Sequence, residues 1–205
     1  MVQLFNDGGN FMWPILGAFI IGLLFVIERL FHLIGGLSSG ENFANRIAQL
    51  VETDGFDKAK AECEAGKGPI ANLCLASLDR AHLGVEEAES YLDKVGSIEM
   101  ASLEKNMTWI SLMIAVAPML GFLGTVWGMI IAFNDIKEAN DISPAVVAGG
   151  ISQALLTTAF GLVVAVILQF LQNTCLYIID KQIVSMQKST STLIASIKDK
   201  FRNEK

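Results

Sequence analysis

The feature that most constrains this chain is a run of 35 residues, from Ala145 to Ile179, that contains no Asp, Glu, Lys, Arg or His. A helix of that length reaches about 52 Å, which exceeds the roughly 30 Å of hydrocarbon in a bilayer. The run therefore predicts a membrane-spanning helix that also projects beyond the membrane. It still contains Gln153, Thr157, Thr158, Gln169 and Gln172. On a helical wheel Thr158, Gln169 and Gln172 share one arc of about 80° with small residues. Since lipid offers such side chains no hydrogen bonds, one face of this helix is predicted to contact another helix or line a cavity.

Two more uncharged runs, Phe11 to Ile27 and Asn106 to Asn134, raise the predicted number of spans to three. The composition agrees, because the chain is 52% hydrophobic and its mean hydropathy is +0.48. The predicted fold class is an all-α membrane protein whose second and third spans extend as long helices into the cytoplasm. The predicted segments are an N-terminal segment with the first span (1–34), a cytoplasmic helical domain (35–105), the second span (106–134), a periplasmic loop (135–144), the third span (145–179) and a cytoplasmic C-terminal helix (180–205).

The distribution of Lys and Arg predicts the orientation of these spans. Of the 15 basic residues, eight lie between the first two spans and six follow the third, whereas the loop between the last two spans holds only Lys137. Basic residues accumulate on the cytoplasmic side, so the amino terminus is expected in the periplasm and the carboxyl terminus in the cytoplasm of a bacterial inner membrane. No Lys or Arg precedes the first span, so no cleaved signal peptide is expected.

Helical spacing of apolar residues predicts three short helices in the cytoplasmic domain, at 42–52, 56–65 and 69–82, with a turn at Thr53-Asp54-Gly55. From residue 85 no Pro intervenes until Pro118, which predicts that the second span is the end of a helix beginning in the cytoplasm. Ser143-Pro144 is a helix-start signal for the third span, and that helix is expected to continue towards the carboxyl terminus.

Several classes of function are excluded by what the chain lacks. The net charge of −6 argues against nucleic acid as a partner. Three cysteines, Cys63, Cys74 and Cys175, without a CxxC spacing predict neither a disulfide framework nor a metal site. Paired carboxylates, an activated nucleophile and a ligand cluster are all missing, so we set an enzyme aside and expect no cofactor.

Small residues recur on one face of the second span, at Ala117, Gly121, Gly124 and Gly128. A face of this kind lets another helix backbone come close. Pro118 removes one backbone hydrogen bond beside it, which suits a lined cavity more than a plain helix bundle.

Two longer motifs are specific. They are APMLGFLGTVWGM at 117–129 and GISQALLTTAFGL at 150–162. Together with Glu28-Arg29-Leu30 after the first span, they resemble the paired signature of the ExbB/TolQ/MotA family of proton-channel subunits. Three spans fit the ExbB/TolQ branch, because MotA proteins carry four.

This resemblance implies a homo-oligomeric ring, pentameric in the branch, around a dimer of a single-span partner of the ExbD/TolR type. The partner's membrane Asp would take up and release protons and so drive a periplasm-spanning protein such as TonB or TolA. The residues of this chain agree with that scheme, since none of its three uncharged runs contains a carboxylate or a His to carry the proton.

The resemblance also assigns roles to individual residues. Thr125 and Thr158 match the family's pore-facing threonines, whose hydroxyls can solvate a carboxylate in either protonation state. Gln153 stands where some members carry Glu; it cannot titrate, which favours a subunit contact shared with Thr157. The remaining candidates for contacts between subunits or with the partner are Gly121, Gly124, Gly128, Pro118, Glu28 and Arg29.

Alternatives remain open at this stage. Thr158 could instead bond the backbone carbonyl four residues earlier in its own helix. The whole chain could be a structural membrane scaffold that conducts nothing, or a stator of the gliding or MotA type. The sequence decides neither between TonB-linked and Tol-type machines nor between protons and sodium ions.

Overall fold

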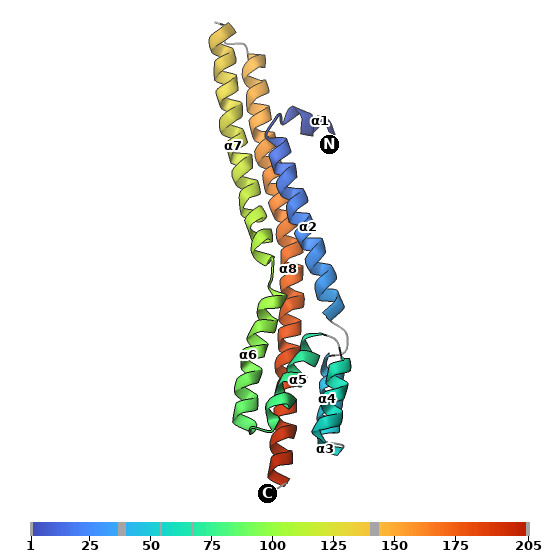
Figure 1. Cartoon of the computed structure of the whole chain (residues 1–205). Helices are drawn as coiled ribbons and strands as arrows, with labels where there is room; N and C mark the ends of the chain where they lie inside the picture. Colours follow the sequence, from blue (N-terminus) through green and yellow to red (C-terminus); the bar gives the residue numbers. More distant parts are fainter. Residues whose placement is uncertain (1, 37–39, 54, 67, 140–143, 204–205) are drawn as a thin grey trace. The chain divides into compact units, whose positions relative to one another are not determined.

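The computed structural model describes residues 2–36, 40–53, 55–66, 68–139 and 144–203, and these ranges contain helices and short turns without a strand (Figure 1). The helices are α1 (Val2–Asp7), α2 (Met12–Gly36), α3 (Gly40–Thr53), α4 (Phe56–Ala65), α5 (Pro69–Ala81), α6 (Val85–Leu103), α7 (Met107–Ala139) and α8 (Pro144–Asn203). The chain divides into two compact units. Unit 1 contains residues 1–29 and 106–175, and unit 2 contains residues 30–105 and 176–205.

Three helical stretches are long and apolar enough to cross a membrane: Met12–Gly35, Val85–Glu138, which a turn at 104–106 divides, and Val147–Arg202. The all-α class and the three predicted spans are therefore confirmed. The last span belongs to α8, which is 60 residues long. This length confirms that the third span continues as a helix far beyond the uncharged run.

The short helices match their predicted positions closely. Helix α4 has the predicted bounds, α3 extends two residues before and one residue after its predicted bounds, and α5 ends one residue early. Helix α8 begins at Pro144, whose fixed φ and missing N–H suit the first position of a helix. Ser143 and Asp54, which the sequence placed in a helix cap and a turn, lie outside the described residues.

The prediction of one continuous helix from residue 85 into the second span is wrong. Helix α6 ends at Leu103 and α7 begins at Met107. Between them Asn106 has a φ of +64°, a left-handed conformation that Asn tolerates better than most residues. Its carbonyl then accepts a hydrogen bond from the N–H of Trp109, 3.1 Å away, in the first turn of α7.

Unit 1 contains a bundle of three apolar segments from α2, α7 and α8. Its core includes Ile15 and Ala18 of α2, Ala117 of α7, and Val164 and Leu168 of α8. Gly22 of α2 has no side chain, and an added Cβ there would lie 2.6 Å from the Leu168 side chain. The side chain of Leu168 therefore fills the space beside Gly22.

In unit 2, polar side chains of α8 bind the ends of other helices. The Gln182 amide nitrogen donates a hydrogen bond to the Leu33 carbonyl, 2.7 Å away, in the last turn of α2. The Lys200 ammonium donates to the Val51 carbonyl, 2.6 Å away, in the last turn of α3. These carbonyls lie in the final turn of each helix, where intrahelical partners run out, and a cation there also suits the helix dipole.

Candidate functional site: the α7–α8 pair

The small residues predicted on the second span lie against α8 of the same chain. A Cβ built on Gly161 would be 2.6 Å from the Ala117 carbonyl oxygen, and one on Gly121 would be 2.9 Å from the Thr157 carbonyl oxygen. A Cβ on Gly128 would be 3.1 Å from the Gly150 carbonyl oxygen. When the contact moves four or seven residues towards the C-terminus of α7, it moves the same number of residues towards the N-terminus of α8. The two helices therefore pack antiparallel in one fixed register, with their backbones in direct contact.

Thr157 lies at the centre of this contact and is fully buried. Its hydroxyl lies 2.7 Å from the Ala154 carbonyl and 3.3 Å from the Gly121 carbonyl, with hydrogen-bond geometry to both. An added Cβ at Gly124 would lie 2.6 Å from the Thr157 hydroxyl oxygen. Gly124 thus provides the space that the Thr157 side chain fills. The sequence assigned Gly121, Gly124 and Thr157 to contacts with another subunit or the partner; the neighbour in this structure is the other helix of the same chain.

Thr158 is only partly buried, at the edge of the same contact. Its hydroxyl donates a hydrogen bond to the Gly121 carbonyl of α7, 3.2 Å away. The bond recorded for Thr158 thus crosses to α7 and does not return to the preceding turn of α8, as the structural alternative supposed.

The two sides of the α7–α8 pair differ. In antiparallel helices, residues just after the contact positions lie on one side, and residues just before them lie on the other. Trp127 precedes Gly128, and its ring lies 6.1 Å from that of Phe11, which adjoins the start of α2. Trp109, on the same side of α7, stacks on Phe25 of α2 at 6.1 Å. Helix α2 therefore covers the side formed by the preceding residues.

We call the opposite side, formed by the residues that follow the contact positions, the open side. Thr125 follows Gly124 and Thr158 follows Thr157, so both threonines lie there. The apolar residues of this side are strongly exposed within the chain, with Phe122 at 68% and Leu155 at 64%. The register thus brings the two sequence-predicted pathway residues to the same uncovered side of the pair.

Other polar groups lie on the open side nearer the start of α7. Gln169 and Asn173 follow the buried residues Leu168 and Gln172, and the Gln169 amide donates to Asn173 over 3.2 Å. Gln172 itself is buried and donates to the Ser111 hydroxyl of α7, 2.5 Å away. On the helical wheel Gln172 shares the polar arc of Gln169, but in the structure it is buried against Ser111 in the helix contact, and Asn173 lies on the open side.

Thr125 and Gln153 occupy different surroundings. The Thr125 hydroxyl donates to the Phe122 carbonyl of its own helix, 2.6 Å away. Gln153 lies on the α2 side, where its amide adjoins the backbone of Gly9. Gly9 has a φ of +71°, which together with the close amide leaves no room for a side chain. Pro118 is partly buried in α7, which remains helical through this residue.

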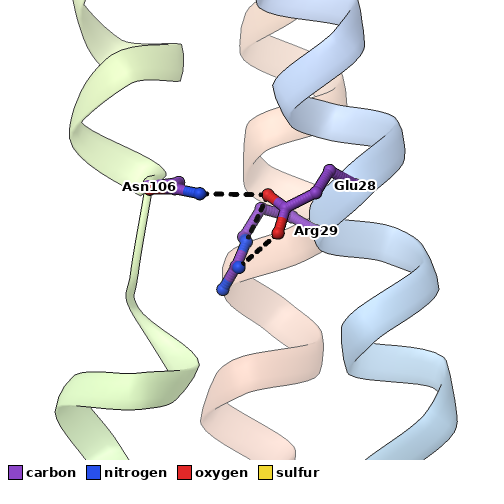
Figure 2. Close-up of polar contacts among 3 residues, drawn as sticks. All are labelled: Glu28, Arg29 and Asn106. Carbon is purple, nitrogen blue, oxygen red and sulfur yellow. Dashed lines mark hydrogen bonds and ion pairs between the residues drawn. The ribbon is translucent and has the colours of Figure 1, made fainter.

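Glu28, Arg29 and Asn106 form a second candidate cluster, where α2 passes the start of α7 (Figure 2). Arg29 is 3% exposed, and its guanidinium donates to both carboxylate oxygens of Glu28, over 3.0 and 2.6 Å. The Asn106 amide donates to the same carboxylate over 3.1 Å. Pairing with a hydrogen-bonded carboxylate reduces the cost of burying a cation. The sequence-based prediction did not include Asn106 among the site residues. An Asn between two apolar helical patterns was the signal that could have identified it.

The described residues contain no cluster of three or more His, Cys, Asp or Glu that could hold a metal ion. The uncharged stretches of α2, α7 and α8 contribute amides and hydroxyls but no Asp, Glu, Lys, Arg or His. A proton cannot reside on these groups at neutral pH, although hydroxyls and amides can solvate one.

These features define a multi-pass helical membrane protein with an uncovered, hydroxyl-bearing side on two closely packed helices. Residues 65–188 match the family model described as the MotA/TolQ/ExbB proton channel family. That match covers more than half of the chain, so the chain belongs to this family.

The names of individual relatives agree with this family. A Methanothermobacter thermautotrophicus protein described as a biopolymer transport protein ExbB homolog is 29% identical over 185 residues, covering 89% of this chain and 65% of the relative. Biopolymer transport protein exbB1 of Vibrio cholerae is 29% identical over 173 residues, covering 80% and 74% of the two chains. The Tol-Pal system protein TolQ of Haemophilus influenzae is 38% identical over 68 residues, covering 33% and 30%. This chain thus spans slightly less than two thirds of the first relative.

Proposed function

We propose that this chain is a subunit of an inner-membrane motor in which the open side of the α7–α8 pair lines a proton pathway. The observation that carries this proposal is the position of Thr125 and Thr158 on one uncovered side of a pair of helices fixed by backbone contact. Their hydroxyls can solvate a carboxylate or a short water chain in a region with few other polar groups.

The acid that carries the proton is proposed to come from a partner. The three uncharged stretches of this chain hold no carboxylate and no His, and a proton relay through hydrocarbon normally needs one of these groups. A single-span protein of the ExbD/TolR type, with an Asp at membrane depth, would supply it. Its helix would pack against the open side, where Phe122 and Leu155 offer apolar surface next to the threonine hydroxyls.

The open side of one chain covers only part of a central helix, so we propose that several copies surround the partner in a homo-oligomer, as a pentamer. Exposed apolar residues on other faces, such as Leu24 (62%) and Phe170 (72%), would contact lipid or neighbouring subunits. With the amino terminus in the periplasm and residues 35–105 and 180–205 in the cytoplasm, the motor would act on a TonB- or TolA-like protein.

The roles proposed for individual residues are based on the contacts that each residue makes. Gly121, Gly124, Gly128 and Thr157 are proposed to fix the α7–α8 pair, and the open side with it. Gln153 lies on the α2 side, so we propose that any contact with a neighbouring subunit occurs there and outside the proton pathway.

The test compares three variants of α8 in the intact complex. Thr158→Val keeps the shape and removes the hydroxyl, Thr158→Ser keeps the hydroxyl, and Thr174→Val is the control. The Thr174 hydroxyl is exposed and donates to Phe170 of its own helix, about 160° away from Thr158. A hydrogen bond to a charged group contributes about 1.5–3 kcal/mol, which corresponds to a fall in proton flux of roughly tenfold or more in Thr158→Val alone.

Proton flux would be measured in vesicles that contain the complex purified from native membranes, with a pH-sensitive dye. Thr158→Ser and Thr174→Val should conduct like the unmodified chain, and all variants should assemble equally. Unchanged flux in Thr158→Val would refute the assignment of Thr158.

A structural scaffold is the second candidate, because the Thr158 hydroxyl already bonds the Gly121 carbonyl. A scaffold would purify as a homo-oligomer without a single-span, Asp-containing protein, and its vesicles would show no proton flux. Capture of such a partner together with flux would exclude it.

A further inference from the structure

Cys63 and Cys74 lie opposite each other in the α4–α5 helical hairpin of unit 2. Both are free thiols and both are 2% exposed. Nothing in the proton pathway uses them. Their arrangement follows from the register of the hairpin.

Gly66 and Ala71 establish that register next to the turn. A Cβ built on Gly66 would lie 2.9 Å from the Ala71 Cβ, so the two backbones are very close there. Cys63 precedes Gly66 by three residues and Cys74 follows Ala71 by three, which places them one helical turn further along the same antiparallel contact.

The register continues to the far end of the hairpin. Ala59 lies seven residues before Gly66, and Leu78 lies seven residues after Ala71. Both are buried. Their successors Lys60 and Asp79 form an ion pair between the two helices. Contacts on both sides of Cys63 and Cys74 thus place the two thiols on facing positions of the hairpin, close enough for a hydrogen bond between them.

We propose that Cys63 and Cys74 are a redox-active dithiol, oxidised by a hydroperoxide to a disulfide that joins α4 to α5. The Cys63 thiolate attacks one peroxide oxygen, the O–O bond breaks, and the released alkoxide or hydroxide takes up a proton. Cys63 is then a sulfenic acid. The sulfur of Cys74 attacks the Cys63 sulfur, the S–S bond forms, the S–O bond breaks, and hydroxide leaves as water with the Cys74 proton. The two thiols lose two electrons, which the peroxide gains.

The environment distinguishes the roles of the two thiols. A hydrogen bond from the Cys74 thiol lowers the pKa of Cys63 from its ordinary value, although burial opposes this. The same bond, together with burial, raises the pKa of Cys74. Cys63 is therefore the attacking thiolate, and Cys74 is the resolving thiol.

Local opening of α4 gives the oxidant access to these buried groups. The helix has only 10 residues, and Gly55 at its start provides no side-chain cap for the free N–H groups. Such a short helix, without a side-chain N-cap at Gly55, depends on packing against α5 and opens more readily than the long helices. A disulfide would suppress that opening and slow amide hydrogen exchange in α4.

The test uses the full-length protein in membranes, with Cys175→Ser to remove the third thiol. Samples are treated with hydrogen peroxide, remaining thiols are alkylated, and peptides are analysed by mass spectrometry. We expect the peptides carrying Cys63 and Cys74 to be joined, lighter by two hydrogen atoms and separable by dithiothreitol. Cys63→Ser and Cys74→Ser should each abolish the link.

Cys63 and Cys74 are near each other in the sequence and could link without the folded hairpin. The control therefore repeats the oxidation on protein unfolded in SDS. The folded protein should form the link at least tenfold faster. Equal rates in the two states would overturn the proposal, because the hairpin would then contribute nothing. So would folded, peroxide-treated protein in which both thiols remain fully alkylated, or in which Cys63 is overoxidised while Cys74 stays free. The unsubstituted pair in the Cys175→Ser protein gives these answers even if a variant at Cys63 fails to fold.

Discussion

Replacing Gly161 by Ala tests the close contact between α7 and α8 directly. The new Cβ would lie 2.6 Å from the Ala117 carbonyl oxygen, about 0.8 Å closer than the 3.4 Å at which ordinary contact begins. The neighbouring atom is backbone, so no side-chain rotation can relieve the clash. The two helices must separate locally, and the 3.2 Å hydrogen bond from Thr158 to Gly121 should lengthen or break.

Overpacking of this kind costs about 1–3 kcal/mol. A Gly-to-Ala change in a helix also gains about 0.5–1 kcal/mol of helix propensity, which would obscure the cost. Gly149→Ala is the matched control, because Gly149 lies in the same helix and its Cβ would meet nothing within 4 Å. Both variants share the propensity gain, so the difference between them isolates the contact.

The assay is unfolding by SDS in mixed micelles, followed by tryptophan fluorescence, since Trp109 and Trp127 both contact aromatic rings beside α7. We expect Gly161→Ala to have a free energy of unfolding about 1–3 kcal/mol below that of Gly149→Ala. Equal stability of the two variants would show that the backbones are not in contact, and the assignment of an open side would lose its basis.

Two further predictions concern the turn before α7 and the end of α3. Asn106→Val should destabilise by about 1–3 kcal/mol more than Asn106→Gly in the same assay, because both variants lose the bond to Glu28 but only Val is strained at a φ of +64°. Equal losses would contradict a strained turn. Lys200→Met should speed amide exchange at the end of α3 roughly 2- to 10-fold, since it removes the donor to Val51. Lys198→Met, at an exposed ion pair, is the control and should leave α3 unchanged.

Much of the fold follows from local sequence patterns. Uncharged runs predicted the three apolar helices, and Pro144 predicted the start of α8, because both signals depend only on neighbouring residues. The break between α6 and α7 was missed, since it contains neither Pro nor Gly. The left-handed conformation of Asn106 combines the tolerance of Asn for that region with a tertiary bond to Glu28, which only the folded chain reveals.

The sequence predicted which residues of α8 share a polar face, but not which of them contact α7. The helical wheel placed Thr158 and Gln172 in one polar arc, but it could not tell which edge of that arc faces α7. The structure buries Gln172 against Ser111 and leaves Thr158 at the edge of the contact. Likewise, the glycines of α7 predicted a close backbone neighbour without identifying it as α8, because small-residue spacing is the same for contacts within and between chains.

The constant register of α7 and α8 has a consequence for how the pair assembles. The contact between Gly128 and Gly150 is close to the connection between the helices, and the contact between Ala117 and Gly161 is farthest from it. Loop-closure entropy increases with the number of residues enclosed, so the inner contact forms at the lowest entropic cost and shortens the effective loop for the next one. The pair is therefore expected to zip from its connection, with Thr158 reaching the Gly121 carbonyl late in the process. A change near residue 150 would slow the first step, whereas a change at residue 161 would speed the opening of the last.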